Sequence, residues 1–136
     1  MAAIVEYEED GGRVVRYVRH ANGGGLVSPE SRVHESAMVA AGAYVEAGAR
    51  VGARSRIGAG SWLHHDVRVG EDVVVAGNVR LGERTRIGNG ARIGTGARVG
   101  ADVRIEPGVK IAPDAVVPEG ALVGRRTGRS DAEIAA

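Results

Sequence analysis

The residues of this sequence best suited to acid–base or metal chemistry are its four histidines, His20, His34, His64 and His65. A histidine titrates near neutral pH, and its neutral imidazole also binds metals. The sequence contains no cysteine, so a zinc site would need histidines and carboxylates. His64 and His65 are adjacent, and neighbouring side chains of a strand point to opposite faces, so this pair is unsuited to one metal ion. We therefore predict no metal site and interpret the histidines first as hydrogen-bonded or solvated surface residues.

The amino-acid composition narrows the set of possible functions further. The 18 basic and 17 acidic residues leave a net charge of +1, which does not suggest a nucleic-acid partner or a polybasic membrane segment. The first ten residues are acidic and lack a long apolar run, so they resemble neither a secretory signal nor a membrane span. No P-loop, dinucleotide motif or nucleophile triad is evident. We expect a protein made in the cytoplasm that needs no cofactor.

The structure that must position these histidines is predicted by a sequence repeat of six residues. Every sixth residue from Val27 to Val123 is Val, Ile or Leu, at seventeen positions without a miss. Four residues after each aliphatic position, from Ser31 to Thr127, every residue is small or β-branched. A period of six fits neither a helix nor simple alternation, but it fits a short strand followed by a tight turn. Gly, Asn and Asp recur at the expected turns, where backbones of positive φ are common.

The pattern resembles the bacterial hexapeptide-repeat superfamily, whose motif is an aliphatic residue, often Gly next, two variable residues, a small residue and another variable one. Residues 51–56 (VGARSR) and 93–98 (IGTGAR) match this motif. The resemblance implies an all-β fold, a left-handed parallel β-helix shaped as a triangular prism, with three strands per coil and about 5.7 coils. It also implies a homotrimer.

Many members of this superfamily are acyltransferases that bind acyl-CoA between subunits. They place a catalytic histidine on or near a loop that interrupts the repeat, and many carry a long C-terminal helix. Here the register never breaks and no such helix is expected. An alternative therefore remains, in which the chain is an acyltransferase of reduced architecture. His64 would be its general base, and Arg125 and Arg126 would lie near the CoA phosphates.

The residue before each aliphatic position points outward, and sorting these residues by coil gives three faces. The arginine face predicts a ladder that is either a solvated surface or a docking site for an acidic partner. The aromatic face begins with large apolar groups, unexpected on a monomer. The arginine face carries Arg32, Arg50, Arg68, Arg86 and Arg104, the aromatic face Leu26, Tyr44, Trp62, Arg80 and Arg98, and the mixed face Met38, Arg56, Val74, Arg92 and Lys110.

The N-terminal segment is expected to be a β-hairpin, with strands at residues 4–9 and 13–19 around a turn at residues 10–12. A two-residue Gly-Gly loop would place one apolar face on both strands, and that face should dock on something. We predict three regions: hairpin and flexible Gly-rich joint at 1–25, β-helix at 26–128, and a short tail at 129–136. The predicted interface comprises Leu26, Met38, Tyr44 and Trp62 on the prism and Val5, Tyr7, Val14 and Val18 on the hairpin.

The unbroken repeat and the outward apolar patch favour a non-catalytic structural or attachment protein over an enzyme. A concrete version is a trimeric decoration protein bound to a viral capsid protein at the virion surface. The alternatives are the acyltransferase and a regulatory module that binds an acidic partner through the arginine ladder.

Overall fold

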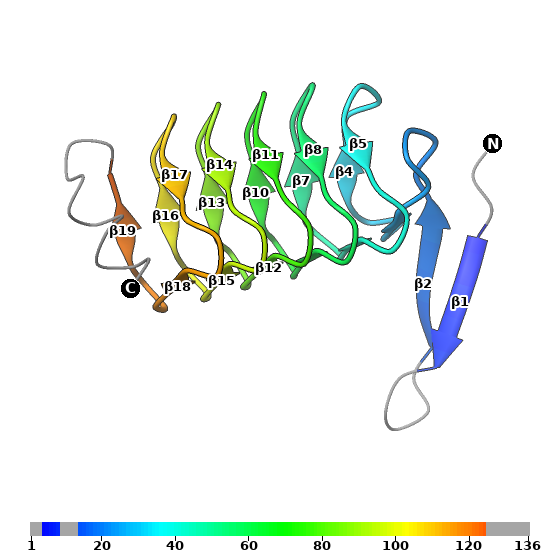
Figure 1. Cartoon of the computed structure of the whole chain (residues 1–136). Coiled ribbons are helices and arrows are strands. Elements are labelled where there is room, and N and C mark those ends of the chain that lie inside the picture. Colours follow the sequence, from blue (N-terminus) through cyan, green and yellow to red (C-terminus); the bar gives the residue numbers. More distant parts are fainter. Residues whose placement is uncertain (1–3, 9–13, 125–136) are drawn as a thin grey trace.

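The computed structural model describes residues 4–8 and 14–124 and shows a left-handed parallel β-helix (Figure 1). Seventeen two-residue strands, β3 to β19, recur every six residues and form the three flat sides of a triangular prism. This confirms the predicted fold class. The described residues contain no helix, so none of them forms a helix that could cross a membrane.

Each side of the prism is one sheet, and each sheet carries one of the three faces. The aromatic face lies on β1 (Ile4–Glu8), β2 (Val14–Arg19), β3 (Leu26–Val27), β6 (Tyr44–Val45), β9 (Trp62–Leu63), β12 (Arg80–Leu81), β15 (Arg98–Val99) and β18 (Val116–Val117). The arginine face lies on β4 (Arg32–Val33), β7 (Arg50–Val51), β10 (Arg68–Val69), β13 (Arg86–Ile87), β16 (Arg104–Ile105) and β19 (Leu122–Val123). The mixed face lies on β5 (Met38–Val39), β8 (Arg56–Ile57), β11 (Val74–Val75), β14 (Arg92–Ile93) and β17 (Lys110–Ile111).

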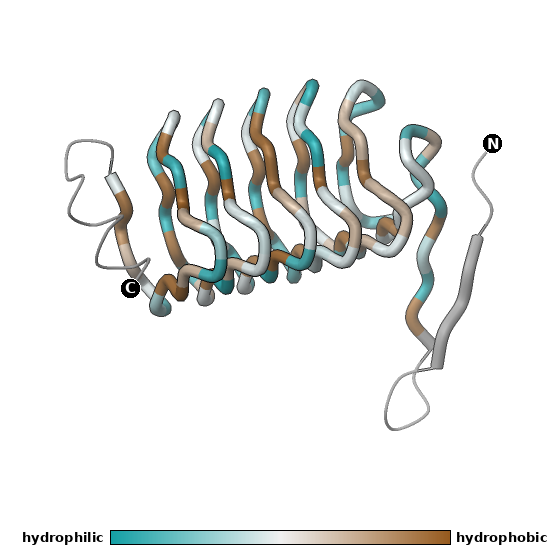
Figure 2. The backbone as a smooth tube through the Cα atoms, viewed as in Figure 1, coloured by the Kyte–Doolittle hydropathy of each residue, from teal (hydrophilic) through white to brown (hydrophobic). Residues whose placement is uncertain are grey.

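The interior consists of columns of equivalent residues from successive coils. Leu63 pairs with Leu81, and Leu81 pairs with Val99, and the first two of these side chains are fully buried. The alternation of buried aliphatic and exposed polar residues is visible as brown and teal bands along every coil (Figure 2). Burial of each such side chain contributes about 1.5–3 kcal/mol. These columns explain why the aliphatic register of the sequence never breaks.

The glycine that often follows the aliphatic residue is required by the close approach of coils. A Cβ atom on Gly82 would lie 2.5 Å from the backbone carbonyl carbon of Gly100 in the next coil. The small residue later in the motif also links coils when it carries a hydroxyl. Ser55 Oγ donates to the carbonyl of Gly70 at 2.6 Å and accepts from the amide of Val73 at 3.1 Å. The motif therefore encodes the spacing between coils as well as the core.

The Gly-rich joint, which was expected to be flexible, is hydrogen-bonded to the end of the prism. The amide of Gly25 donates to the carbonyl of Val39 at 2.8 Å, and the amide of Val39 donates to the carbonyl of Asn22 at 3.0 Å. The first coil has no preceding coil on the mixed face, and unpaired backbone groups there would be costly. The joint supplies the missing partners. Gly23 fits because its φ is +108° and a Cβ there would collide with the Val39 carbonyl.

The hairpin strands form as predicted, but their register differs by one residue. Val5 pairs with Tyr17 and Ile4 pairs with Val18, so Val5 and Val18 do not stand opposite each other. The grouping of Val5 and Tyr7 with Val14 and Val18 assumed the other register, and the side chains of Val5, Tyr7 and Val14 lie outside the described part of the structure. The turn at residues 9–13 that sets this register lies outside the described residues.

The hairpin is joined to the prism through both its backbone and Tyr17. Strand β2 pairs antiparallel with β3 and so extends the sheet of the aromatic face. The Tyr17 ring packs edge-on against Tyr44 with centroids 5.5 Å apart, and the Tyr17 hydroxyl is 2.9 Å from both carboxylate oxygens of Glu46. Tyr17 and Glu46 are 6% and 5% exposed. A buried carboxylate held by a hydroxyl thus fixes the hairpin on the prism.

We predict that Tyr17→Phe lowers the free energy of unfolding by about 1–3 kcal/mol, because it removes a donor from a buried carboxylate and keeps the ring. Urea unfolding followed by circular dichroism measures the change. Tyr44→Phe is the matched control, since no hydrogen bond of the Tyr44 hydroxyl is found among the described residues, and it should change stability by less than about 0.5 kcal/mol. Equal losses in the two variants would contradict the assigned role of the Tyr17 hydroxyl.

Candidate functional site

Three of the four histidines lie where a structural role accounts for them and no catalytic role is needed. His20 Nε2 lies 2.7 Å from the carbonyl oxygen of Ala37, and His34 Nδ1 accepts from the amide of Ser36 at 3.0 Å. His65 lies at a corner, where its carbonyl accepts from the amide of Arg84 at 3.1 Å. In residues 4–8 and 14–124, no group of three or more histidines and carboxylates is placed to hold a metal ion. His64 is therefore the candidate for chemistry.

His64 occupies a position of the repeat that is normally filled by a very small residue. It follows the core residue Leu63 on β9, and the equivalent position is Gly or Ala in eleven of the seventeen repeats. In the preceding coil the same position holds Glu46, because β6 and β9 are paired in register. Stacking of coils therefore brings an imidazole and a carboxylate into neighbouring rungs of one column.

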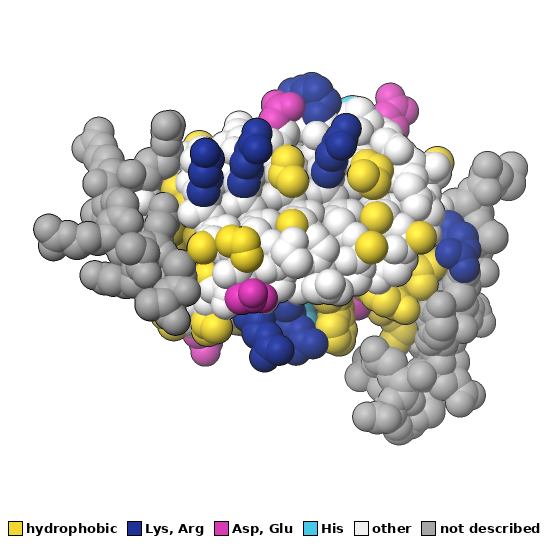
Figure 3. Space-filling view, viewed as in Figure 1, with side chains coloured by type: hydrophobic (Ala, Val, Ile, Leu, Met, Phe, Trp, Pro, Cys, Tyr) yellow, Lys and Arg dark blue, Asp and Glu magenta, His cyan; other side chains and the backbone are white. Residues whose placement is uncertain are grey.

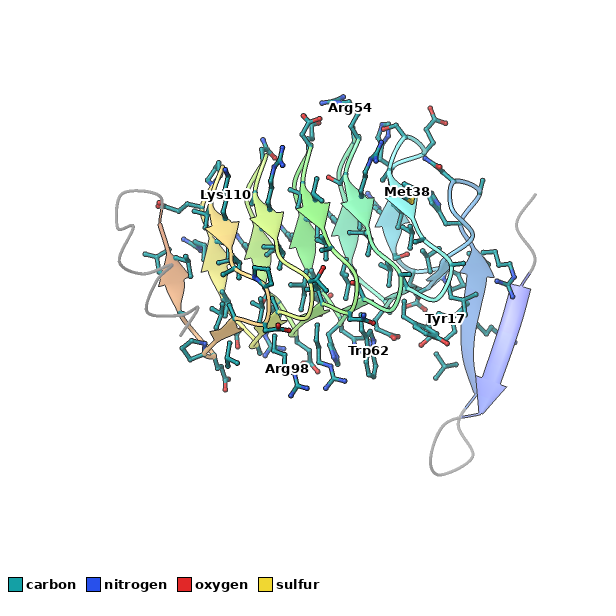
Figure 4. All side chains as sticks on the ribbon, in the orientation of Figure 1. Tyr17, Met38, Arg54, Trp62, Arg98 and Lys110 are labelled. Atoms are coloured by element: carbon teal, nitrogen blue, oxygen red, sulfur yellow. The ribbon has the colours of Figure 1, made fainter. Side chains whose placement is uncertain are left out.

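Trp62 connects these two side chains. Its indole Nε1 donates to Glu46 Oε2 at 2.7 Å, and its ring stacks on the His64 ring with centroids 4.4 Å apart and planes 20° apart. Arg80 of the next coil places its guanidinium carbon 5.5 Å from the Trp62 centroid, within the range of a cation–π contact. Figure 4 shows Trp62 and Arg98 projecting from the same side of the prism as Tyr17. The imidazole is thus held in one orientation on the aromatic face.

The surroundings of His64 favour its neutral form. Partial burial lowers the pKa of His64 first, and the positive charge of Arg80 lowers it further, while Glu46 and Glu83 act in the opposite direction. A lowered pKa leaves the imidazole unprotonated at neutral pH, so it is able to accept a proton. The nearby carboxylate of Glu46 would stabilise the imidazolium that forms.

Glu46 was not recognised from the sequence. The sequence does contain a signal for it, because Glu46 is a charged residue at a repeat position that usually carries Gly or Ala. Its burial could not be foreseen, since that depends on Tyr17 of the hairpin and on the indole of Trp62, and the register of the hairpin is not encoded in the repeat.

The arginine face is a second candidate site. Arg32, Arg50, Arg68, Arg86 and Arg104 pair in register from β4 to β16, which confirms that they form one ladder. Two hollows run along the ladder on its two sides and share Arg50, Arg68, Arg86 and Arg104. His64 lines neither hollow, although the corner that follows it contributes Asp66 to the first.

The predicted interface residues do not form one surface. Leu26, Tyr44 and Trp62 follow one another along the aromatic face, where Leu26 is 6% and Trp62 38% exposed. Met38 stands on the mixed face, which Figure 3 shows as basic side chains interrupted by hydrophobic ones, and Val18 packs against the core. The side chains of Val5, Tyr7 and Val14, together with Arg125 and Arg126, lie outside the described part of the structure.

The comparisons with known proteins agree with this architecture. Residues 61–95, which include Trp62, His64 and Arg80, match the family model "Bacterial transferase hexapeptide (six repeats)". The UDP-N-acetylglucosamine O-acyltransferase of Moraxella catarrhalis RH4 is 21% identical with a TM-score of 0.60 over 72% of this chain and 48% of the enzyme, so this chain spans about half its length. A putative acetyltransferase of Bacillus cereus is 19% identical with a TM-score of 0.53 over 69% of each chain. No curated protein matches the sequence significantly.

These findings correct the function predicted from the sequence. The prediction of a non-catalytic structural or attachment protein, such as a capsid decoration protein at the virion surface, is wrong, because the repeats match a transferase model and the solved structures with this fold are described as acyltransferases. The absence of an interrupting loop was given too much weight. The repeat, the family model over residues 61–95 and the shared fold together support the predicted resemblance to the hexapeptide-repeat superfamily of left-handed parallel β-helices.

Proposed function

We propose that the protein is an acyltransferase that uses an acyl-CoA donor and His64 as its general base. The observation that carries this proposal is the environment of His64: a partly buried imidazole of lowered pKa, stacked on Trp62 and next to the buried carboxylate of Glu46. Trp62 and His64 lie within the segment that matches the transferase model, and Glu46 lies one coil before His64. A general base of this kind contributes about 10²–10⁴-fold to a reaction rate.

In the proposed reaction, neutral His64 removes a proton from a hydroxyl or amino group of the acceptor. The freed electron pair forms a bond to the thioester carbonyl carbon, the carbon–sulfur bond then breaks, and the proton passes from the imidazolium to the departing CoA thiolate. Trp62 holds the ring plane and Glu46 stabilises its transient charge. Each turnover returns His64 to its neutral form.

The aromatic face also carries charges suited to the donor. Arg80 and Arg98 stand on β12 and β15, in the two coils that follow Trp62, and both are exposed. Arginine pairs well with phosphate because its guanidinium presents several donors in one plane. We assign these two residues to the CoA phosphates, with Arg125 and Arg126 as further candidates.

We also propose that the protein is a homotrimer whose contact lies at the corner between the mixed and aromatic faces. Met38 on β5 and Tyr44 on β6 flank this corner. In a triangular prism that corner lies opposite the arginine face. A contact there would cover apolar side chains and keep the five arginines of each copy away from those of the others, which avoids like-charge repulsion.

We predict that His64→Asn lowers the rate of CoA release from acetyl-CoA by at least about 100-fold, because the general base is lost. The assay follows free thiol with a panel of amino- and hydroxyl-bearing saccharides as acceptors. The adjacent corner residue provides the control, and His65→Asn should keep the rate within about twofold. Undiminished turnover by His64→Asn would contradict the assignment, as would failure of the unmodified protein to bind CoA in calorimetry.

A measurement independent of activity tests the electrostatics of the site. NMR titration of the His64 ring should give a pKa below the ordinary value of about 6.5. Arg80→Gln removes a positive charge and should raise this pKa, whereas Glu46→Gln removes a negative charge and should lower it further. Shifts of the opposite sign, or no shift in either variant, would show that these groups do not control the imidazole.

Light scattering tests the assembly. The unmodified protein should have three times the mass of the chain, and Met38→Arg should shift it toward monomer, because the variant would bury an unpaired charge at the contact. Leu122→Arg is the control, since Leu122 is 64% exposed on β19, in the sheet of the arginine face and so away from the proposed contact. A monomeric unmodified protein, or dissociation by both variants, would contradict the proposed contact.

A further inference from the structure

We propose that the arginine face binds a linear acidic polysaccharide, with one acidic group of the chain near each rung of the ladder. This binding function is separate from the acyl transfer proposed above and does not depend on it. It is carried by three observations: the ladder arginines form no ion pair within the described residues, they lie between two hollows, and their spacing is regular over the length of the prism.

The first observation is the contrast between the ladder and the corner arginines. Arg54 donates to Asp72 at 2.8 and 3.0 Å, and Arg84 donates to Asp102 at 2.7 and 3.1 Å, each across to the next coil. Among the described residues, no carboxylate forms an ion pair with any of the five ladder arginines. The chain thus neutralises its corner arginines and leaves the ladder exposed. Like charges on neighbouring rungs repel, and an anionic ligand would remove that repulsion.

The second observation is the shape of the surface beside the ladder. The first hollow, of about 610 Å³, is lined by five arginines and two aspartates, Asp66 and Asp102, so cations outnumber carboxylates. The second, of about 420 Å³, has Glu106 as its only acidic lining residue among the described residues, against four arginines. Its remaining lining residues are Val69, Gly70, Ile87, Gly88, Ile105 and Pro107, of which Val69, Ile87 and Ile105 belong to the buried core.

The third observation is the continuity of the charge. Rungs repeat at about 4.8 Å, so the five arginines from Arg32 to Arg104 span about 19 Å. In the described residues the other two faces lack such a row: Val74 interrupts the basic residues of the mixed face, and Tyr44 and Trp62 precede Arg80 and Arg98 on the aromatic face. A ligand that uses the whole ladder must therefore be a chain with regularly repeated acidic groups.

Among polyanions, the surface favours a uronate polysaccharide. Its repeat is one pyranose ring with one carboxylate, close in length to the rung spacing of about 4.8 Å. Single-stranded nucleic acid relies on aromatic side chains to stack its bases, and no lining residue of either hollow is aromatic. A β-strand of an acidic protein repeats its side chains on one face at about 6.6 Å, which does not match the rungs.

Calorimetry with oligogalacturonates tests the proposal. Affinity should rise with chain length up to four or five rings and then level off, and it should fall as salt is added, because the contacts are exposed charge pairs. The methyl-esterified oligomer of equal length, which keeps the rings and loses the charges, should not bind. No binding of the pentamer, or equal binding of its methyl ester, would overturn the proposal. Tighter binding of polyphosphate or of oligo(dT) with the same number of charges would also overturn it.

A pair of matched double variants locates the site. Arg68→Gln with Arg86→Gln removes the centre of the ladder and should weaken pentamer binding by about tenfold, the loss expected for two exposed charge pairs. Arg56→Gln with Arg92→Gln removes the same charge from the mixed face and should change the affinity by less than about twofold. All four side chains are exposed, so the thermal stability of both variants should match that of the unmodified protein. Equal weakening by the two pairs would mean that net charge, not the ladder, attracts the ligand.

Discussion

The stacking of one coil on the next is the interaction on which the rest of the structure depends. The amide of Arg68 donates to the carbonyl of Thr85 at 2.9 Å, the amide of Gly70 donates to that of Ile87 at 2.9 Å, and equivalent bonds recur along all three sides. Each bond adds only about 0.5–1.5 kcal/mol, but together they fix a single register. Residues eighteen positions apart therefore lie in contact, and every side chain belongs to a column.

Column geometry also explains how a candidate site arises without any insertion. The position after the core residue is Gly or Ala in eleven of the seventeen repeats, which leaves the surface smooth, and a larger side chain there projects outward. Glu46 and His64 are two such residues in successive coils, and Trp62 joins them by a hydrogen bond to one and a ring stack on the other. An unbroken repeat is thus compatible with catalysis. A change of residue type within the repeat can provide a reactive side chain, as an inserted loop does in other proteins.

The sequence predicted the structural features that repeat along the chain, but not the contacts that occur only once. Seventeen copies of one pattern reinforce each other, so the strands, the faces and the arginine ladder follow from the period alone. The hairpin has a single register, set by a single turn, and a change of one residue there exchanges Val18 for Tyr17 opposite Val5. The burial of Glu46 depends on that one event, because Tyr17 supplies its hydroxyl. The contact of the joint with the prism also occurs once: Gly23 and Gly25 permit a close approach to Val39 that the repeat does not encode.

The stacking of coils also brings like charges close together on the arginine face, whereas ion pairs offset this repulsion at the corners. When a column repeats one charged residue, its rungs repel, and the corner columns escape this by placing Asp72 and Asp102 one coil after Arg54 and Arg84. The ladder column repeats Arg from β4 to β16 without such a substitution, although an aspartate or glutamate on alternate rungs would remove the repulsion. Pairs of like charges also stand on neighbouring rungs of the other two faces, Arg80 with Arg98 and Arg92 with Lys110, but the ladder continues the same charge over five rungs. Because the corner columns show that the fold tolerates alternating charges, the uniform ladder is better explained by what it binds than by how it folds.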